Sequence, residues 1–280
     1  MEDTQALPPA AASTVAGPPL EVLDPMERAA FRAVRWLSSG GGAALGRFLQ
    51  RRVLPRLFGL LVGRRLDVHG LERLRGIPAD APILLVANHR SFFDLFALGW
   101  VFARDPDSRR SFSFPVRANF FYENPLGLLI VMLCSGGAMF PPFFRSPQKR
   151  AFNAYSLDLL IEMLRQPGAL VGFHPEGTRN RSDDPYELLR AQPGAGELSL
   201  KARPVVVPAF INGLSNSVLS ELRADLSSAN RITAVFGSPV ELPEASGETR
   251  LSQHKRFADL LLEKIRALGE EERRLRAPAQ

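Results

Sequence analysis

The sequence contains one cysteine and four histidines among its 280 residues. A single cysteine excludes an intramolecular disulfide framework. No His-Glu-x-x-His segment is present and the histidines are scattered singly, so the sequence does not indicate a zinc site. A Gly-x-Ser-x-Gly segment is also missing, which removes support for a serine nucleophile on a strand–helix elbow. The N-terminus has no basic stretch followed by an apolar one, so no secretory signal is predicted and a cytoplasmic protein is expected.

Acidic residues are outnumbered by basic ones, 29 against 35, which gives a formal net charge of +6. Such a balance indicates an anionic partner, which could be nucleic acid, a membrane surface or a phosphorylated substrate. Nucleic-acid binding has only the charge in its favour, because no nucleic-acid-binding motif is present. A hydrophobic content of 45% fits a globular core with room for membrane contact.

The composition divides the chain into three segments. Residues 1–24 are rich in alanine and proline without apolar periodicity, which predicts a disordered tail. Residues 25–65 carry apolar residues at helical spacing in two pieces, around Phe31–Leu37 and Phe48–Val62. Residues 66–280 form the third segment and contain the candidate catalytic residues.

The middle segment is strongly basic, and Glu27 is its only acidic residue. Arginines beside apolar faces, together with Trp36, favour a pair of amphipathic helices lying in a membrane interface. The alternative is a helical hairpin that packs on the main domain and exposes a solvated basic face. Membrane association is the preferred interpretation.

Apolar runs of strand length alternate with helical patterns from Leu66 to Leu268, which predicts an α/β domain. Pro208 lies inside one strand and predicts a bulge or an edge position there. Residues 270–276 are charged and are expected to be a frayed helix end. The expected strands are the start of Leu66–Leu74, Ile83–Ala87, Ser111–Arg117, Ala138–Phe140, Ala169–Phe173, Val205–Ile211 and Arg231–Phe236, and the expected helices are Leu95–Ala103, Leu126–Leu133, Pro147–Arg165 and Leu251–Leu268.

Pro125–Phe144 is uncharged over twenty residues, long enough for a membrane span. However, Gly136-Gly137 and Pro141-Pro142 interrupt it. A buried helix, a glycine turn and a short strand are therefore predicted in preference to a span.

His89 and Asp94 flank a strand-to-helix connection, because the apolar run Ile83–Ala87 ends just before His89 and another begins after Asp94. With His89 in the loop and Asp94 in the first helical turn, the carboxylate could hold one ring nitrogen and leave the other as a base. Ser91 is a candidate N-cap. The spacing alone is common, and a histidine that merely caps the loop is the alternative.

A second loop, His174–Arg181, follows another strand and places Glu176 and Arg179 where ligands of α/β sheets bind. Arginine matches phosphate with paired hydrogen bonds. A surface ion pair in a turn is the alternative.

Together, the two loops resemble the glycerolipid acyltransferase superfamily, specifically the 1-acylglycerol-3-phosphate (lysophosphatidate) acyltransferases. The resemblance rests on Asn88-His89-Arg90-Ser91 with Asp94 and on Pro175-Glu176-Gly177-Thr178-Arg179. Val68–Leu74 is similar to the family's opening strand and turn, and Val205–Pro208 to its last signature strand. The similar part covers about residues 66–236.

The resemblance implies a mixed sheet flanked by helices and an acyl transfer from a thioester to a lysolipid hydroxyl. His89 would take the proton of the acceptor hydroxyl and Asp94 would orient His89. Glycerol phosphate would be bound by Glu176, Gly177, Thr178, Arg179 and a separate arginine, for which Arg145 is the first candidate and Arg117 the reserve.

Three features depart from the commonest family pattern: His174 before the proline, Arg181–Tyr186, and the wide spacing before Arg145. His174 and Arg181–Tyr186 leave open an acceptor other than lysophosphatidate, and the wide spacing before Arg145 is the reason why Arg117 is kept as the reserve. The expected partners are acyl-CoA or acyl carrier protein as donor, a lysophospholipid as acceptor and anionic lipid at the cytoplasmic membrane face. No metal and no organic cofactor are expected. A thioesterase and a non-catalytic lipid-binding protein remain alternative functions.

Overall fold

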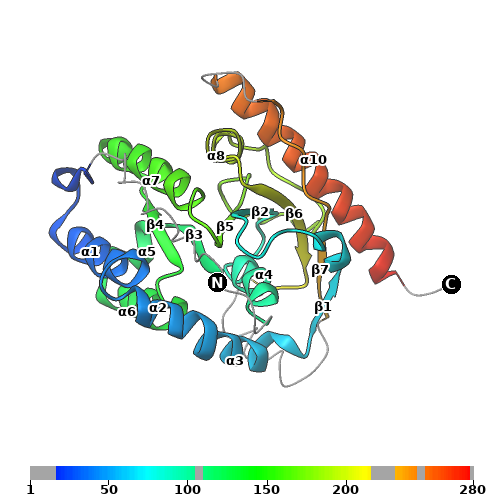
Figure 1. The fold of residues 1–280 in the computed structure, drawn as a ribbon, viewed down its shortest axis with the longest axis horizontal. Coiled ribbons are helices and arrows are strands. Elements are labelled where there is room, and N and C mark those ends of the chain that lie inside the picture. The colour runs from blue at the N-terminus through cyan, green and yellow to red at the C-terminus, as the bar shows by residue number, and fades with distance from the viewer. Residues whose placement is uncertain (1–16, 105–109, 216–230, 245–249, 278–280) are drawn as a thin grey trace, which may run out of the picture.

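The computed structural model describes residues 17–104, 110–215, 231–244 and 250–277 (Figure 1). Its centre is a seven-stranded sheet in the order β1-β7-β6-β2-β5-β3-β4. All neighbouring strands are parallel except β6 and β7, so the predicted mixed α/β sheet is confirmed. The strands are β1 (Leu66–His69), β2 (Ile83–Ala87), β3 (Ser111–Arg117), β4 (Met139–Phe143), β5 (Ala169–Phe173), β6 (Val205–Asn212) and β7 (Ile232–Phe236).

Strand β2 is fully buried because helices cover both faces of the sheet, which explains its unbroken apolar run. Ile83, Leu85 and Ala87 point to one core cluster, and Leu84 and Val86 to the other. Helices α1 (Pro25–Ser39) and α4 (Asp94–Ala103) contribute to the first cluster, α8 (Gly194–Ala202) and α10 (Leu251–Arg276) to the second, and α7 (Arg150–Met163) to both.

The predicted helix pair in residues 25–65 is confirmed. Helix α1 is followed by a break at Gly40–Gly42, then α2 (Ala43–Phe48), α3 (Leu54–Phe58) and wider π-helical turns at Leu49–Val53 and Gly59–Gly63. Phe31 and Val34 of α1 are buried in the core, so this region packs on the domain as a hairpin does.

The predicted tail is too long at its C-terminal end. Leu20–Val22 form a 3-10 turn, and the Leu23 side chain is 2% exposed in the core. The apolar residues of this turn were too few to show periodicity in the sequence. Residues 1–16 lie outside the described part of the chain.

Three other expectations need correction. Helix α6 (Pro125–Ser135) is not buried, because Leu126, Leu129 and Leu133 are each more than half exposed. Helix α10 continues through the expected frayed end, held by the fully buried Glu272. Pro208 lies in an interior strand, and its register with β2 shows no bulge. The pairs of β6 with β7 begin one residue later, at Ala209.

The predicted glycine turn and strand after α6 are present as Gly136-Gly137 and β4. Within the described residues, no helix combines the length and apolar character needed to cross a bilayer. The remaining short elements are the 3-10 turns Leu71–Leu74 and Pro147–Lys149 and helix α5 (Ala118–Phe121).

Candidate active site

The two loops singled out from the sequence meet at the C-terminal ends of β2 and β5. These strands are neighbours in the sheet, with Val86 opposite Phe173. His89 follows the end of β2 by two residues and His174 follows β5 directly. Residues 85 positions apart in the chain therefore lie side by side, at the edge of the sheet where ligands of α/β proteins bind.

Asp94 is the first residue of α4, and its side chain is 1% exposed. Its Oδ2 atom accepts hydrogen bonds from the backbone N–H groups of Arg90 and Ser91, each at 2.7 Å, and lies 3.1 Å from Nδ1 of His89. Because a carboxylate only accepts, Nδ1 of His89 carries the hydrogen and Nε2 has the free lone pair. The expected pairing geometry is present.

The N-cap position of α4 is occupied by Phe93 and not by the expected Ser91. Ser91 instead stabilises the loop itself. Its hydroxyl accepts from the backbone N–H of Phe93 at 3.2 Å and donates to the carbonyl of Ser215 at 2.6 Å. The loop that carries His89 is therefore fixed from both ends.

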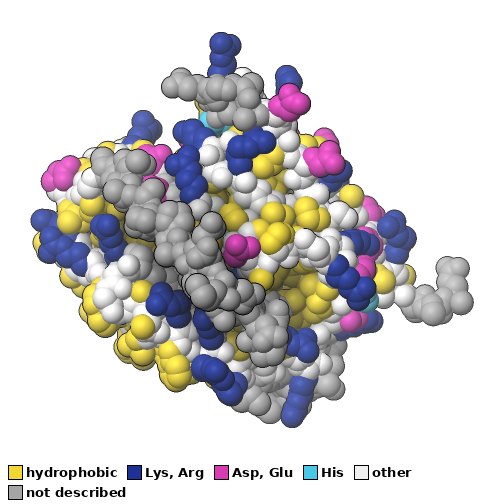
Figure 2. Space-filling view, viewed as in Figure 1, with side chains coloured by type: hydrophobic (Ala, Val, Ile, Leu, Met, Phe, Trp, Pro, Cys, Tyr) yellow, Lys and Arg dark blue, Asp and Glu magenta, His cyan; other side chains and the backbone are white. Residues whose placement is uncertain are grey.

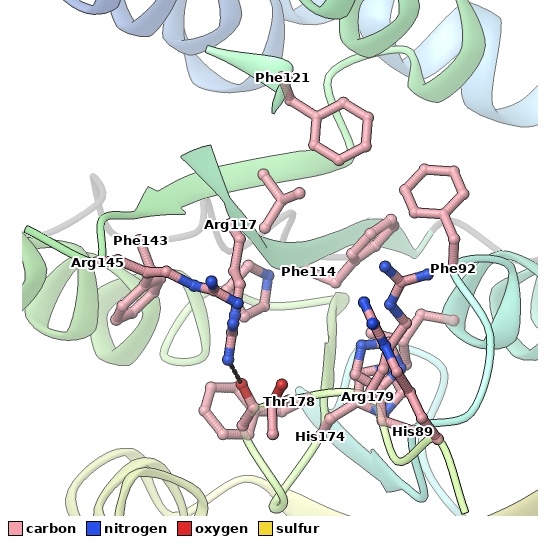
Figure 3. Close-up of a pocket in the computed structure, with 16 residues that line it drawn as sticks. His89, Phe92, Phe114, Arg117, Phe121, Phe143, Arg145, His174, Thr178 and Arg179 are labelled. Atoms are coloured by element: carbon pink, nitrogen blue, oxygen red, sulfur yellow. Dashed lines mark hydrogen bonds between the residues drawn. The ribbon is translucent and has the colours of Figure 1, made fainter. Parts of the chain in front are cut away.

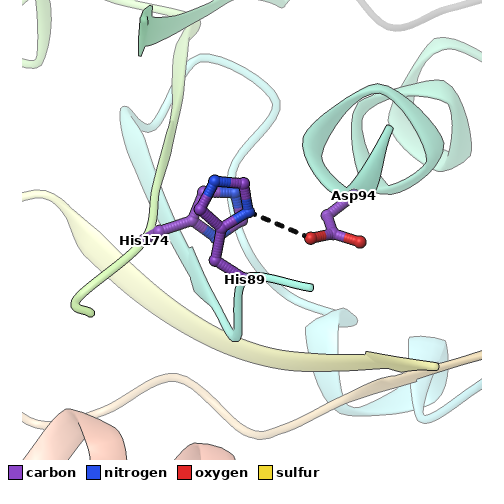
Figure 4. Close-up of side chains that lie close together, drawn as sticks. All are labelled: His89, Asp94 and His174. Atoms are coloured by element: carbon purple, nitrogen blue, oxygen red, sulfur yellow. Dashed lines mark hydrogen bonds and ion pairs between the residues drawn. The ribbon is translucent and has the colours of Figure 1, made fainter. Parts of the chain in front are cut away.

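His174 stacks on His89, as Figure 4 shows. The ring centroids are 3.8 Å apart and the planes differ by 7°. Nδ1 of His174 lies 3.0 Å from the carbonyl oxygen of Ala87, and because a carbonyl only accepts, this nitrogen is protonated. The sequence marked His174 only as a departure from the family pattern, and its contact with His89 depends on the strand order.

Burial determines the protonation of both rings. It lowers the pKa of His89 to about 3, and the positive charges of Arg179 and Arg117 act in the same direction. Burial likewise lowers the pKa of His174 to about 3, with the nearby His89 as a further cause. Both imidazoles are neutral at pH 7, so His89 is in the form that can take a proton.

Glu176 holds the two loops together. Its Oε1 atom accepts from the backbone N–H of His89 and its Oε2 atom from that of Leu189, both at 2.7 Å. The backbone N–H of Asn180 also donates to the carbonyl of His89 at 2.8 Å. Burial raises the pKa of Glu176 to about 7. Glu176 is not among the residues that line the cavity described below, and its two carboxylate oxygens are taken up by these backbone contacts. Direct contact of Glu176 with the acceptor stays a prediction.

A cavity of about 570 Å³ opens beside His89 (Figure 3), a volume typical of sites for small organic ligands. Arg117 comes from the end of β3 and donates to the carbonyl of Gly177 at 2.8 Å. Arg145 follows β4 and also lines the cavity, although Pro141-Pro142 stretch its spacing in the sequence. Among the described lining residues none is acidic, and the basic ones are Arg117, Arg145, Arg179 and Arg181.

The expected Gly177 and Thr178 also line this cavity. Six of the eight site residues expected from the sequence therefore line the cavity. Asp94 lies behind His89, to which it is hydrogen-bonded, and Glu176 lies in the supporting loop.

The cavity has an apolar part that the sequence did not assign. Phe92 and Phe121 stack at a centroid distance of 5.3 Å, and Phe114 lies nearby on β3. Phe143 and Val116 add further apolar surface. The pair Phe92-Phe93 beside Asp94 was the one available signal in the sequence. A cavity with arginines and aromatic rings fits an amphipathic ligand that carries both an anionic group and an apolar chain.

His89, Asp94 and His174 are also the described residues whose donor atoms come close enough to suggest a metal site, all within 4.8 Å. Their hydrogen bonds argue against that use. Both Nδ1 atoms donate within the protein, and lone pairs in the planes of two parallel stacked rings do not converge on one ion.

Comparison with known proteins identifies the family. An acyltransferase family model matches residues 65–212. A chloroplastic 1-acyl-sn-glycerol-3-phosphate acyltransferase of Arabidopsis thaliana is 29% identical over 53% of this chain and 36% of its own length. A 1-acyl-sn-glycerol-3-phosphate acyltransferase of Saccharomyces cerevisiae is 24% identical over 64% of this chain and 53% of its own length. The chain thus spans about half or less of the curated relatives it matches.

A crystal structure of the 1-acyl-sn-glycerophosphate acyltransferase from Thermotoga maritima superposes with a TM-score of 0.51. The match covers 89% of this chain and 94% of that one at 18% identity, so it supports the fold.

Proposed function

Because the chain belongs to the acyltransferase family, we propose that it moves a fatty acyl group from an acyl thioester to the hydroxyl of a lysophospholipid. The simplest acceptor is 1-acylglycerol-3-phosphate, which the curated relatives' names state. Acyl-CoA or acyl carrier protein would be the donor, without a metal or organic cofactor.

In this reaction His89 acts on the acceptor hydroxyl. Nε2 takes the hydroxyl proton while the oxygen attacks the thioester carbonyl carbon. The tetrahedral intermediate then collapses, the carbon–sulfur bond breaks, and the imidazolium returns the proton to the leaving thiolate. Asp94 keeps the proton of Nδ1 in place and stabilises the imidazolium through the hydrogen bond of 3.1 Å.

The observation that carries the proposal is the joint presence of a neutral imidazole base, four arginines and an aromatic region in one cavity. The arginines suit the phosphate of the acceptor, and the aromatic region suits an acyl chain. A thioesterase would share the base and would differ in having water as the acceptor, so the two functions are separated by the products.

The proposal is tested by incubating the protein with acyl-CoA or acyl carrier protein and a panel of lysolipids, with product masses as the readout. We expect phosphatidate from 1-acylglycerol-3-phosphate and little thioester cleavage without an acceptor. Rapid cleavage unaffected by lysolipid would instead identify a thioesterase. No turnover of any donor would favour a non-catalytic lipid-binding protein.

We further propose that the exposed face of α2, α3 and α6 rests on an anionic membrane. Figure 2 shows hydrophobic side chains gathered along the lower left edge, over α2 and α6. Gln50 and Ser38 join these helices to the end of α6, donating to the carbonyls of Gly136 and Gly137 at 3.0 and 2.6 Å. The exposed large apolar residues of these helices and of the turn between α2 and α3 are Leu45, Phe48, Val53, Leu57, Leu126, Leu129 and Leu133.

Charge makes a lipid surface the favoured occupant of this face. Arg47, Arg51, Arg52 and Arg56 are exposed in the same segment, and no acidic residue occurs from residue 28 to residue 65. Arginines beside apolar side chains match anionic headgroups above acyl chains. That this membrane face is the cytoplasmic one stays a prediction.

Replacing Leu126, Leu129 and Leu133 together with aspartate should reduce flotation with phosphatidylglycerol-containing vesicles by at least about tenfold, since each buried leucine is worth about 1.5–3 kcal/mol. All three are exposed, so the fold should persist. Leu251→Asp, at a residue 67% exposed on α10, is the matched control and should float like the unaltered protein. Undiminished flotation of the triple variant would contradict this orientation.

A further inference from the structure

His174 has a place in the site that neither the family pattern nor the proposed reaction uses. Its ring lies parallel to that of His89 at 3.8 Å, as close as aromatic rings pack. It begins the loop that also carries Glu176 and Arg179, so it connects the base to the anion-binding loop.

We propose that His174 is a positioning residue for His89: a neutral ring that fixes the plane of the catalytic imidazole and stabilises its protonated form during turnover. This inference deepens the proposed acyl transfer and rests on it for the kinetic predictions.

Fixing the plane matters because the hydrogen bond from Nδ1 to Asp94 holds the His89 ring at one atom. One such bond leaves the ring free to rock about the Nδ1–Oδ2 direction, which would move Nε2 away from the acceptor hydroxyl. The parallel face of His174 opposes that motion. Misplacement of a reacting atom by about 1 Å can cost about 10²-fold in rate.

Stabilisation of the protonated form follows from the state of His174. Its Nδ1–H donates to the carbonyl of Ala87, and the ring is kept neutral by burial. The face of a neutral aromatic ring attracts a cation, so it favours the imidazolium that forms on His89. A protonated His174 would repel that imidazolium instead. Its contact with Ala87 and its burial therefore suit one role, that of a ring that stays neutral throughout.

A second catalytic base is a poorer assignment for His174. Its Nδ1 donates to the neutral carbonyl of Ala87, whereas Nδ1 of His89 donates to a carboxylate that stabilises the imidazolium. Its ring packs against the face of His89, not in line with either nitrogen. A proton relay through a face-to-face stack has no hydrogen-bonded path.

Two substitutions separate the ring from its hydrogen bond. His174→Phe retains an aromatic face and loses the donor to Ala87. His174→Asn can retain a donor to Ala87 through its amide and loses the aromatic face. We expect kcat of His174→Phe to stay within about threefold of the unaltered protein. We expect His174→Asn to lose about tenfold in kcat, equivalent to about 1.4 kcal/mol, with KM for the acceptor nearly unchanged.

A purely structural role of His174 would give another pattern, in which both variants lose activity in proportion to their loss in Tm. Full kcat in His174→Asn, or equal losses in both variants at matched Tm, would overturn the proposal.

Nitrogen NMR of labelled histidine tests the positioning without any substrate. At pH 7, His89 and His174 should both show the neutral tautomer with hydrogen on Nδ1. In His174→Asn the Nδ1–H signal of His89 should broaden or exchange faster, and in His174→Phe it should persist. An unchanged His89 signal in His174→Asn would contradict the proposal. Because this measurement needs no turnover, it stands even if acyl transfer itself is not found.

Discussion

Replacing His89 with alanine should lower kcat for acyl transfer by about 10²–10⁴-fold, the usual contribution of a positioned base. The variant should still fold, because Oδ2 of Asp94 loses the His89 ring but retains the backbone N–H groups of Arg90 and Ser91. KM for the acceptor should change little, because the imidazole acts on the proton and not on the phosphate.

His69→Ala is the matched control for this experiment. His69 is also a histidine paired with an aspartate, with Nε2 2.9 Å from Oδ2 of Asp67, but it lies on β1 and does not line the cavity. The His69→Ala variant should transfer acyl groups at the rate of the unaltered protein. Rates are measured with purified proteins of confirmed fold, by circular dichroism and thermal unfolding. Undiminished transfer by His89→Ala would refute the mechanism.

Replacing Arg179 with alanine should lower kcat/KM for a phosphate-bearing acceptor by about 10–100-fold. A hydrogen bond to a charged group contributes about 1.5–3 kcal/mol, and each 1.4 kcal/mol is tenfold. The effect should be small with an uncharged acceptor such as a monoacylglycerol. Arg179 is a cleaner choice than Arg117, because Arg117 also donates to Gly177 and its loss would disturb the loop.

Arg190→Ala is the matched control, because this exposed arginine follows the same loop without lining the cavity. Comparing phosphate-bearing with uncharged acceptors separates a lost anion contact from general damage. Equal losses with both acceptors would contradict an anion-binding role for Arg179.

The Arg179→Ala variant should also shift the pH dependence of acyl transfer. The positive charge of Arg179 lowers the pKa of His89, so its removal should raise that pKa. The base works only when it is deprotonated. As the solution is acidified, the activity of Arg179→Ala should therefore begin to fall at a higher pH than the activity of the unaltered protein. The pH profile of kcat/KM with an uncharged acceptor measures this shift without interference from phosphate ionisation. By the same reasoning, a phosphate bound between Arg117 and Arg179 would make His89 more basic.

Much of the fold could be predicted from sequence because its signals are local. Strands such as Ile83–Ala87 and Ala169–Phe173 are apolar runs of the right length, and both are present with the predicted bounds. The break between the N-terminal helices follows from three consecutive glycines. Exposure could not be predicted from local signals. Leu126, Leu129 and Leu133 of α6 are exposed although Val131 in the same apolar run is buried, and hydropathy alone does not distinguish a core face from an exposed one.

The candidate site divides in the same way. The sequence by itself made the pairing of His89 with Asp94 one of two interpretations, because a residue five positions on, at the start of the next helix, can reach the histidine side chain, and the structure shows this contact. It also marked the arginine-bearing loop, because that loop directly follows a buried strand.

Only the tertiary structure decided what those two loops do to each other. The order of β2 and β5 in the sheet brings His174 onto His89 and turns Glu176 into a support for the catalytic loop. The order β5-β3-β4 places Arg145 at the cavity. Such contacts depend on which strands become neighbours, and the spacing of residues along one chain does not contain that choice.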